Sequence, residues 1–260
     1  MAELRQLLAG FDPDAGLSLP DDWCQGRTAY GGLTAATALL AALRVLPAGQ
    51  GTLRSAQLAF VGPADGRLRY SASTLRSGKS VSSIGVDVAG DSGMAARALF
   101  VFGQERSSTI AHDFSPPPPA SSHDRYPMVD LAAMPFAPAF IRHFQLRPAA
   151  GAMPLSGADT PEMVMWLAHA DAAGVDPAVA LLAVADALPP AAFTAYTRPA
   201  PISTITWSLD LLGPLQPTQW YLLRSASVHA ADGYSVQSMQ VWDEYGRLLL
   251  RGRQCVAVFA

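Results

Sequence analysis

The sequence predicts an α+β protein made of two fused, similar halves, each with a central helix wrapped by an antiparallel sheet. Two observations predict this architecture. Three short motifs recur in the same order in both halves of the 260-residue chain, and internal repeats indicate a duplicated structural unit. In each half, an apolar helix-like segment precedes runs with the pattern of strands.

The recurring motifs keep a nearly constant spacing. Residues 60–63 (FVGP) match 211–214 (LLGP), residues 78–86 match 233–241, and the glycine turn at 91–93 matches the one at 244–246. The offsets between the copies are 151, 155 and 153 residues. Three matches in one order, with only small loop changes between them, predict that both halves share a fold.

Two segments have the composition of buried helices. Residues 30–43 are rich in Ala and Leu, are apolar around most of the circumference and end before Pro47. Residues 177–188 have Pro177 at a first helical position and Pro189 directly after the last one. A helix that is apolar on all sides is normally buried, so both are predicted to lie under their sheets.

Each helix is followed by a predicted meander of three to four antiparallel strands. Residues 68–75 and 220–227 are half-apolar extended runs. Gly78 and Gly233 begin the next strand of each half, and glycine-containing turns lead into the last one. Ahead of the second helix, residues 162–169 suit a further strand.

A proline-rich stretch separates the two halves. Residues 115–124 read SPPPPASSHD, which is typical of a stiff, polar connector. We therefore expect an N-terminal unit over residues 1–115, a linker over 116–139 and a C-terminal unit over 140–260. The strands of the second unit are predicted to resume near residues 140–146.

Composition narrows the classes of partner and the location. A net charge of −3 and a pI near 5.9 argue against nucleic acid, which attracts concentrated Lys and Arg. No apolar run approaches the roughly 20 residues that cross a bilayer, and the N-terminus lacks the pattern of a signal peptide. We therefore expect a cytoplasmic protein without a membrane partner.

Neither a metal site nor a serine-hydrolase site is indicated. Cys24 and Cys255 lie near opposite ends of the chain, outside any CxxC or Cys/His pattern. The five histidines are scattered, with no pair at metal-ligand spacing. A Gly-x-Ser-x-Gly elbow is also missing from the sequence.

Four short segments carry a resemblance to one family. They are Tyr30-Gly31-Gly32 at the start of the first helix, 182–186 (LAVAD) at the end of the second, 203–205 (STI), and 253–254 (RQ). In these segments, and over nearly the whole chain, the sequence resembles the acyl-CoA thioesterases II of the double-hotdog type. The resemblance implies a double-hotdog fold and the hydrolysis of acyl-CoA to a free acid and CoA.

The resemblance also implies the catalytic residues. In that family an Asp, a Thr or Ser, and a Gln of the second half converge on a water that attacks the thioester carbonyl; the matching residues are Asp186, Thr204 and Gln254. A carboxylate can orient the water and accept its proton, while a hydroxyl and an amide fix its other hydrogen bonds. A thioester is reactive enough for a well-oriented water, so neither a metal nor a covalent cofactor is expected.

The first helix offers candidate donors for the oxyanion. Tyr30, Gly31 and Gly32 lie at its start, where backbone N–H groups are unpaired and the helix dipole is positive. Gly31 and Gly32 have no side chains to block an approaching carbonyl. The apolar residues along both central helices are expected to line a tunnel for the acyl chain.

Contacts to the rest of the substrate are less well defined by the sequence. The CoA phosphates are expected at the surface, with Arg76, Lys79 and Arg142 as open alternatives for binding them. Where many family members have Asp-His after the Thr-Ile pair, this chain has Thr206 and Trp207, so we expect its acyl pocket or the neighbouring hydrogen bonds to differ from theirs. Since hotdog sheets tend to join edge to edge, a dimer of the fused unit is expected.

The repeat predicts that the polar set belongs to one half only. With the offset of 153, Gln254 corresponds to Val101, and with the offset of 151, Thr204 corresponds to Leu53. The first helix contains no Asp. This asymmetry favours one active site per chain.

Each of the three predicted catalytic residues also fits a purely structural role. Asp186 could be a solvent-facing residue at a helix end, Thr204 is an ordinary strand residue, and Gln254 could point outwards. A non-catalytic protein that binds acyl thioesters therefore stays an alternative, as does a hotdog dehydratase. Dehydratases of this fold usually rely on a His beside an acid, and neither predicted central helix contains His.

Overall fold

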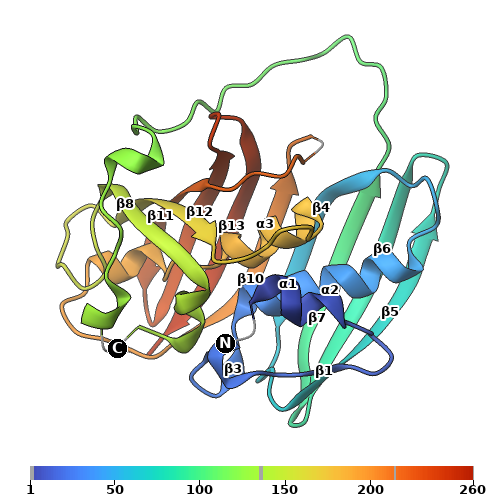
Figure 1. Cartoon of the computed structure of the whole chain (residues 1–260), viewed down its shortest axis with the longest axis horizontal. Coiled ribbons are helices and arrows are strands. Elements are labelled where there is room, and N and C mark those ends of the chain that lie inside the picture. Colours follow the sequence, from blue (N-terminus) through green and yellow to red (C-terminus); the bar gives the residue numbers. More distant parts are fainter. Residues whose placement is uncertain (1–2, 135–136, 214, 260) are drawn as a thin grey trace.

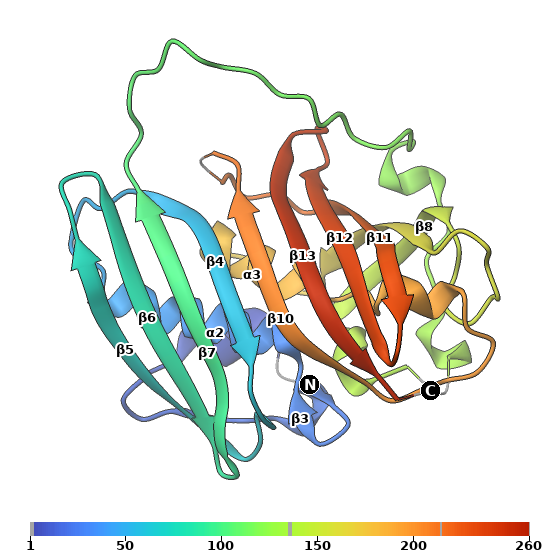
Figure 2. The same ribbon diagram turned by 180° about the vertical axis from the view of Figure 1, so that it is seen from behind.

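One antiparallel sheet runs through the whole molecule, and two buried helices cross one of its faces (Figure 1). The computed structural model describes residues 3–134, 137–213 and 215–259. Pro214, the last residue of a repeated motif, lies outside the described residues. Viewed from behind, the strands form a continuous surface with the helices on the far side (Figure 2).

The elements alternate along the chain in two similar series. The helices are α1 (Leu4–Ala9), α2 (Gly31–Val45) and α3 (Pro177–Ala185). The strands of the first half are β1 (Leu17–Ser18), β2 (Cys24–Gln25), β3 (Thr28–Ala29), β4 (Thr52–Phe60), β5 (Arg67–Ser77), β6 (Val81–Gly90) and β7 (Gly93–Gly103). Those of the second half are β8 (Phe144–Gly151), β9 (Glu162–His169), β10 (Ile202–Leu211), β11 (Tyr221–Ala231), β12 (Tyr234–Asp243) and β13 (Leu248–Val258).

The strand order shows the duplication directly. The eleven-stranded sheet has the order β1-β5-β6-β7-β4-β10-β13-β12-β11-β9-β8, while β2 and β3 form a separate hairpin. The order β5-β6-β7-β4 is mirrored as β10-β13-β12-β11, and the two halves meet where β4 pairs with β10. The predicted α+β double hotdog is therefore confirmed.

The registers refine the predicted repeat. A bulge separates Leu53 from Ser55 in the pairing of β4 with β7, and a matching bulge separates Thr204 from Thr206 in the pairing of β10 with β13. These positions differ by 151 residues, as predicted. In the next strands, however, the register makes residue 84 equivalent to 237, an offset of 153, so the offset of 155 is wrong by two residues.

Local sequence determines where the second helix begins and ends. Asp176 accepts hydrogen bonds from the backbone N–H of Ala178 (2.8 Å) and Val179 (3.3 Å), and Pro177 occupies the first turn. The helix ends at Ala185, three residues before the predicted end. Residues that precede a proline disfavour helical backbone, and two prolines follow closely.

Two other differences from prediction have local causes. Residues 139–143 form a 3-10 helix after Pro138, so β8 begins at Phe144 rather than near residue 140. The first part of the predicted linker packs through Ala120 and Tyr126 on a tryptophan-rich cluster on the outer face of the second half. The indole N–H groups of Trp166 and Trp242 donate to the carbonyls of Ser121 and Ser115, so these backbone carbonyls fix the start of the linker against the sheet.

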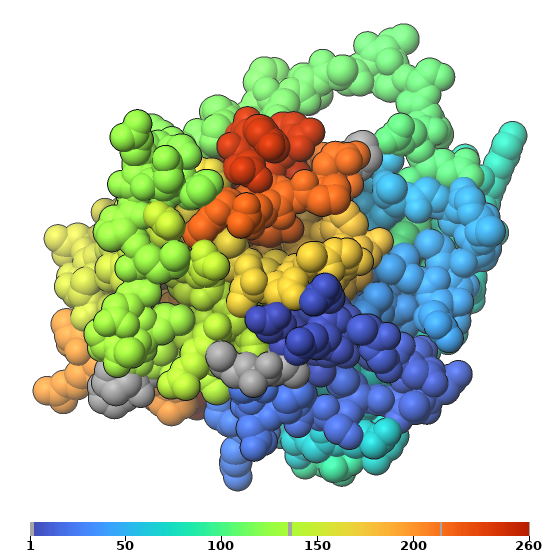
Figure 3. All heavy atoms as spheres, viewed as in Figure 1, coloured from blue at the N-terminus to red at the C-terminus, as the bar shows by residue number. Residues whose placement is uncertain are grey.

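The N-terminal segment closes over the helix face. Figure 3 shows α1 lying against the segment around α3. The Arg5 guanidinium forms a salt bridge of 3.0 Å with Asp171, and the Arg5 backbone N–H donates to the Asp171 carbonyl. Within the described ranges, the structure contains no helix with the length and apolar character needed to span a membrane.

Candidate active site

A pocket of about 570 Å³ opens at the N-terminus of α2, between the two halves. Gly31 and Thr34 of α2 line it, together with Phe60 at the end of β4. The second half contributes Asp186 and Thr204. Two of the three residues predicted to be catalytic therefore lie in one pocket, although they are 18 residues apart and on different elements.

Asp186 is held by groups from both halves. It follows the last residue of α3 and remains partly exposed towards the pocket. Its Oδ1 accepts a hydrogen bond of 2.5 Å from the Gln254 Nε2 group, and the Gly32 backbone N–H donates to the same carboxylate. Gly32 lies in the first turn of α2, so the carboxylate faces the positive end of the helix dipole.

The absence of a side chain at Gly31 provides the space that the Asp186 carboxylate occupies. A Cβ atom at position 31 would lie 2.5 Å from Asp186 Oδ2, which is far below van der Waals contact. The backbone of Gly31 does not need a positive φ. The close approach of the carboxylate is therefore what requires Gly at this position.

The environment changes the acidity of Asp186. Burial raises its pKa to about 7, and the hydrogen bonds from Gln254 and Gly32 only partly oppose this rise. Near neutral pH both protonation states are populated. A carboxylate with such a pKa is suited to accept a proton from water, because general bases work best with a pKa near the working pH.

A chain of hydrogen bonds extends from Asp186 into the second half. Gln254 Oε1 accepts a bond of 2.5 Å from the Gln237 Nε2 group, and Gln237 Oε1 accepts one of 2.7 Å from the Ala191 backbone N–H. The ionised carboxylate can only accept and the backbone N–H can only donate, so both ends fix the direction of the chain. Both glutamines are almost fully buried, and Gln254 touches the pocket only through Asp186.

We expect Gln237→Leu to lower kcat about tenfold, because Gln254 would lose its orienting donor and the buried Ala191 N–H would lose its acceptor. A weaker hydrogen bond from Gln254 to Asp186 should also raise the apparent pKa of Asp186. The measurement is the pH–rate profile, in which this pKa appears. Gln57→Leu, on the exposed face of β4, is the matched control. A normal kcat and an unchanged profile in Gln237→Leu would show that the chain does not position Asp186.

A β-bulge directs Thr204 into the pocket. Thr206 pairs with Cys255 and Thr204 pairs with Val256, so Ile205 is the extra residue. Without it, Thr204 would share the outer face with Thr206, because side chains alternate along a strand. In the described part of the chain, the Thr204 hydroxyl has no hydrogen-bond partner, and it is free to bind a ligand or water.

The equivalent positions of the first half are apolar. The registers relate Thr204 to Leu53, Gln237 to Ile84 and Gln254 to Phe100. Gln254 thus corresponds to Phe100, and the predicted match of Gln254 with Val101 is wrong by one residue. Leu53, Ile84 and Phe100 belong to the hydrophobic core, so the polar set occurs in the second half alone.

Tyr30 contributes packing rather than a pocket surface. Its side chain is fully buried, stacks on Phe140 at 4.0 Å between ring centroids, and donates a hydrogen bond of 2.8 Å to the Ala183 carbonyl. Of the three residues at the start of α2, only Gly31 lines the pocket, and the Gly32 N–H is directed to Asp186. A role for these residues in binding an oxyanion stays a prediction.

Gln237 is the member of the site that sequence patterns did not reveal. It lies in an alternating strand where a polar residue usually faces solvent, and only the register places it next to Gln254 on the inner face. Trp207, noted as a departure from the family pattern, is fully buried and pairs with Gln254 across the strands.

The sheet order and the two buried helices define a protein of the double-hotdog class. Comparison with family models matches residues 19–103 to the acyl-CoA thioesterase N-terminal domain and residues 111–258 to the acyl-CoA thioesterase C-terminal domain. The chain belongs to this acyl-CoA thioesterase family and is a thioester hydrolase. A search of curated proteins finds no match.

Solved structures share the fold. A conserved protein of unknown function with a hot dog fold from Alicyclobacillus acidocaldarius is 23% identical, with 94% of this chain and 92% of that chain covered and a TM-score of 0.84. A putative thioesterase II from Thermobifida fusca is 17% identical, with the same coverage and a TM-score of 0.80. A putative thioesterase from Novosphingobium aromaticivorans is 23% identical, with 94% and 95% covered and a TM-score of 0.76.

Proposed function

We propose that the protein hydrolyses acyl-CoA to a free acid and CoA by direct attack of water, with Asp186 as the general base. The observation that supports this most strongly is a carboxylate with a pKa raised to about 7 at the wall of a pocket that both halves form. Such a group can take the proton from a water molecule as the oxygen attacks the thioester carbonyl. The new C–O bond forms, the C–S bond breaks, and the thiolate of CoA leaves.

The other residues have different parts in this proposal. Thr204 holds the water through its free hydroxyl, which limits the orientations of the attacking oxygen. Gln254 is a positioning residue, because it is buried and its amide already bonds to Asp186 and Gln237. The Gly32 N–H already binds Asp186, so the positive end of the α2 dipole is the feature that favours negative charge on the carbonyl oxygen.

The direct test is the release of CoA, followed with a thiol reagent over acyl-CoAs from acetyl through palmitoyl, with phenylacetyl-CoA as an aromatic member. Turnover by the wild-type protein would support the proposal and report the acyl preference. If no member is hydrolysed while acyl-CoA still binds, the proposed reaction is wrong for these substrates.

Activity should depend on pH through Asp186. Because only the ionised carboxylate can accept the proton, kcat/KM is expected to rise about tenfold per pH unit at low pH and to level off above about pH 7. The measurement is a profile from pH 5 to pH 8.5, corrected for spontaneous thioester hydrolysis. A flat profile across this range would argue against Asp186 as the base.

A further inference from the structure

The pocket has one positively charged side chain at its mouth. Among the described residues that line the pocket, Arg27 is the only Lys or Arg. It is exposed, and within the described chain it has no ion-pair or hydrogen-bond partner. An unpaired arginine at the opening of a pocket is available for a negatively charged part of a ligand.

The backbone presents Arg27 in a defined position. It lies in the turn of the β2–β3 hairpin, where Gly26 has a φ of 67°. The hairpin is fastened to the loop between β4 and β5, since the Ala64 N–H donates to Thr28 Oγ1 (2.9 Å) and the Ala29 N–H donates to the Ala64 carbonyl (2.7 Å). The arginine therefore projects from a fixed support rather than from a free loop.

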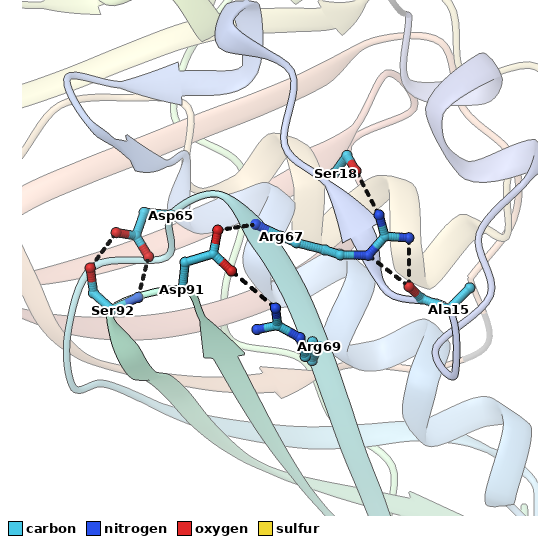
Figure 4. Close-up of polar contacts among 7 residues, drawn as sticks. All are labelled: Ala15, Ser18, Asp65, Arg67, Arg69, Asp91 and Ser92. Atoms are coloured by element: carbon cyan, nitrogen blue, oxygen red, sulfur yellow. Dashed lines mark hydrogen bonds and ion pairs between the residues drawn. The ribbon is translucent and has the colours of Figure 1, made fainter.

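The two aspartates near this opening, Asp65 and Asp91, already have hydrogen-bond partners in neighbouring segments (Figure 4). The Asp65 carboxylate, which lines the pocket, accepts bonds from the Ser92 backbone N–H (3.0 Å) and hydroxyl (2.5 Å). The Asp91 carboxylate accepts bonds from the Arg67 backbone N–H and the Arg69 guanidinium. Neither aspartate forms a salt bridge with Arg27.

The positive charge at this opening comes from Arg27. The other charged residues of the pocket lining, within the described chain, are Asp65, which is bonded to Ser92, and Asp186, which is bonded to Gln254. Arg67 and Arg69 lie outside the pocket lining, and their guanidinium groups are bonded to Ala15, Ser18 and Asp91 (Figure 4). An anionic part of a ligand at this opening would therefore be attracted to Arg27.

Arg27 and the reactive centre lie within the span of one long substrate. Gly31, which touches the Asp186 carboxylate, is only four residues further along the chain, so the two Cα atoms are at most about 14 Å apart. The arginine side chain adds to this reach. An extended pantetheine arm separates a thioester from the phosphates of CoA by a length of this order.

We propose that Arg27 binds a phosphate group of the CoA moiety and thereby sets the preference for CoA thioesters; this rests on the proposed function. None of Arg76, Lys79 and Arg142 lines the pocket. Arg76 lies at the other end of β5 from Arg67, about 30 Å along the strand. Its distance from the rim makes it the matched control.

The test is calorimetric binding of CoA, dephospho-CoA and pantetheine to the wild type, Arg27→Gln and Arg76→Gln. We expect Arg27→Gln to bind CoA about tenfold more weakly, with pantetheine affinity unchanged, and Arg76→Gln to behave as wild type. An equal loss with dephospho-CoA would place Arg27 at the pyrophosphate, and no loss would place it at the 3′-phosphate. Wild-type affinity of Arg27→Gln for CoA, or an equal loss for pantetheine, would overturn the assignment.

A separate measurement keeps the two proposals distinguishable. Hydrolysis of an acyl-pantetheine by the wild type reports the thioesterase reaction without any phosphate. Turnover of acyl-pantetheine with no effect of Arg27→Gln on CoA binding would reject Arg27 alone. A phosphate-dependent loss of CoA binding, with no turnover of either thioester, would reject the proposed reaction and leave the role of Arg27 in place.

Discussion

Replacing Asp186 with Asn is expected to lower kcat by about 10²–10⁴-fold while acyl-CoA still binds. The reason is that Asn cannot accept the proton of the attacking water, and the loss of a general base has effects of this size. Asn keeps an oxygen that can accept the hydrogen bond from Gln254, so the surrounding chain of hydrogen bonds should persist. The measurement is steady-state turnover and acyl-CoA binding, with the exposed Asp210→Asn as the control.

Stability provides an independent check on the same variant. The folded-state pKa of Asp186 is raised from 3.8 to about 7, so folding favours the protonated form of this carboxyl. The free energy of unfolding of the wild type therefore falls as the pH rises from 3.8 to about 7. Asn carries no ionisable group, so Asp186→Asn lacks this fall in the free energy of unfolding. At pH 8 its free energy of unfolding should exceed that of the wild type by about 1–4 kcal/mol, with a smaller difference at pH 5.

Reduced turnover together with reduced stability at both pH values would indicate a damaged fold and not a missing base. Wild-type turnover in Asp186→Asn would exclude Asp186 from the chemistry. The control Asp210→Asn should change neither quantity, because Asp210 is exposed on β10 and does not line the pocket.

Gly31→Ala is expected to lower kcat about 100-fold without unfolding the protein. The added Cβ would lie 2.5 Å from Asp186 Oδ2, so the carboxylate must move, and a displacement of about 1 Å at a reacting group can cost this much activity. Gly31 begins α2 and has no positive φ. Ala therefore suits its backbone, and the melting temperature should change little.

The matched control is Gly10→Ala, since a Cβ at position 10 meets nothing within 4 Å. Turnover and melting temperature measured on both variants separate a local displacement from a general effect of replacing Gly. Normal kcat in Gly31→Ala would mean that the carboxylate tolerates movement, and that its close approach to α2 is not needed for catalysis.

The fold could be predicted because its signals are local and repeated. The motifs around Gly62 and Gly213 recur, and the two apolar helices are bounded by prolines. The same patterns could not give the exact register. A β-bulge adds one residue without a marked sequence signal, so Gln254 was matched to Val101 rather than Phe100.

The site was less predictable, because its geometry depends on contacts between distant segments. Asp186 lies in the pocket as the resemblance implied, yet the closeness of Gly31 follows from the way α2 and α3 cross. The inner-face position of Gln237 depends on register alone. Arg27, in a two-residue turn, has no periodicity that could reveal its place at the pocket.

The most direct test of water activation by Asp186 is a single-turnover reaction in H₂¹⁸O, with mass spectrometry of the released acid and of the peptide that contains Asp186. If Asp186 acts as a general base, one ¹⁸O atom enters the released acid and the Asp186 peptide stays unlabelled. Incorporation of ¹⁸O into Asp186 with an unlabelled acid would instead show that the carboxylate attacks the thioester itself, and would contradict direct attack by water.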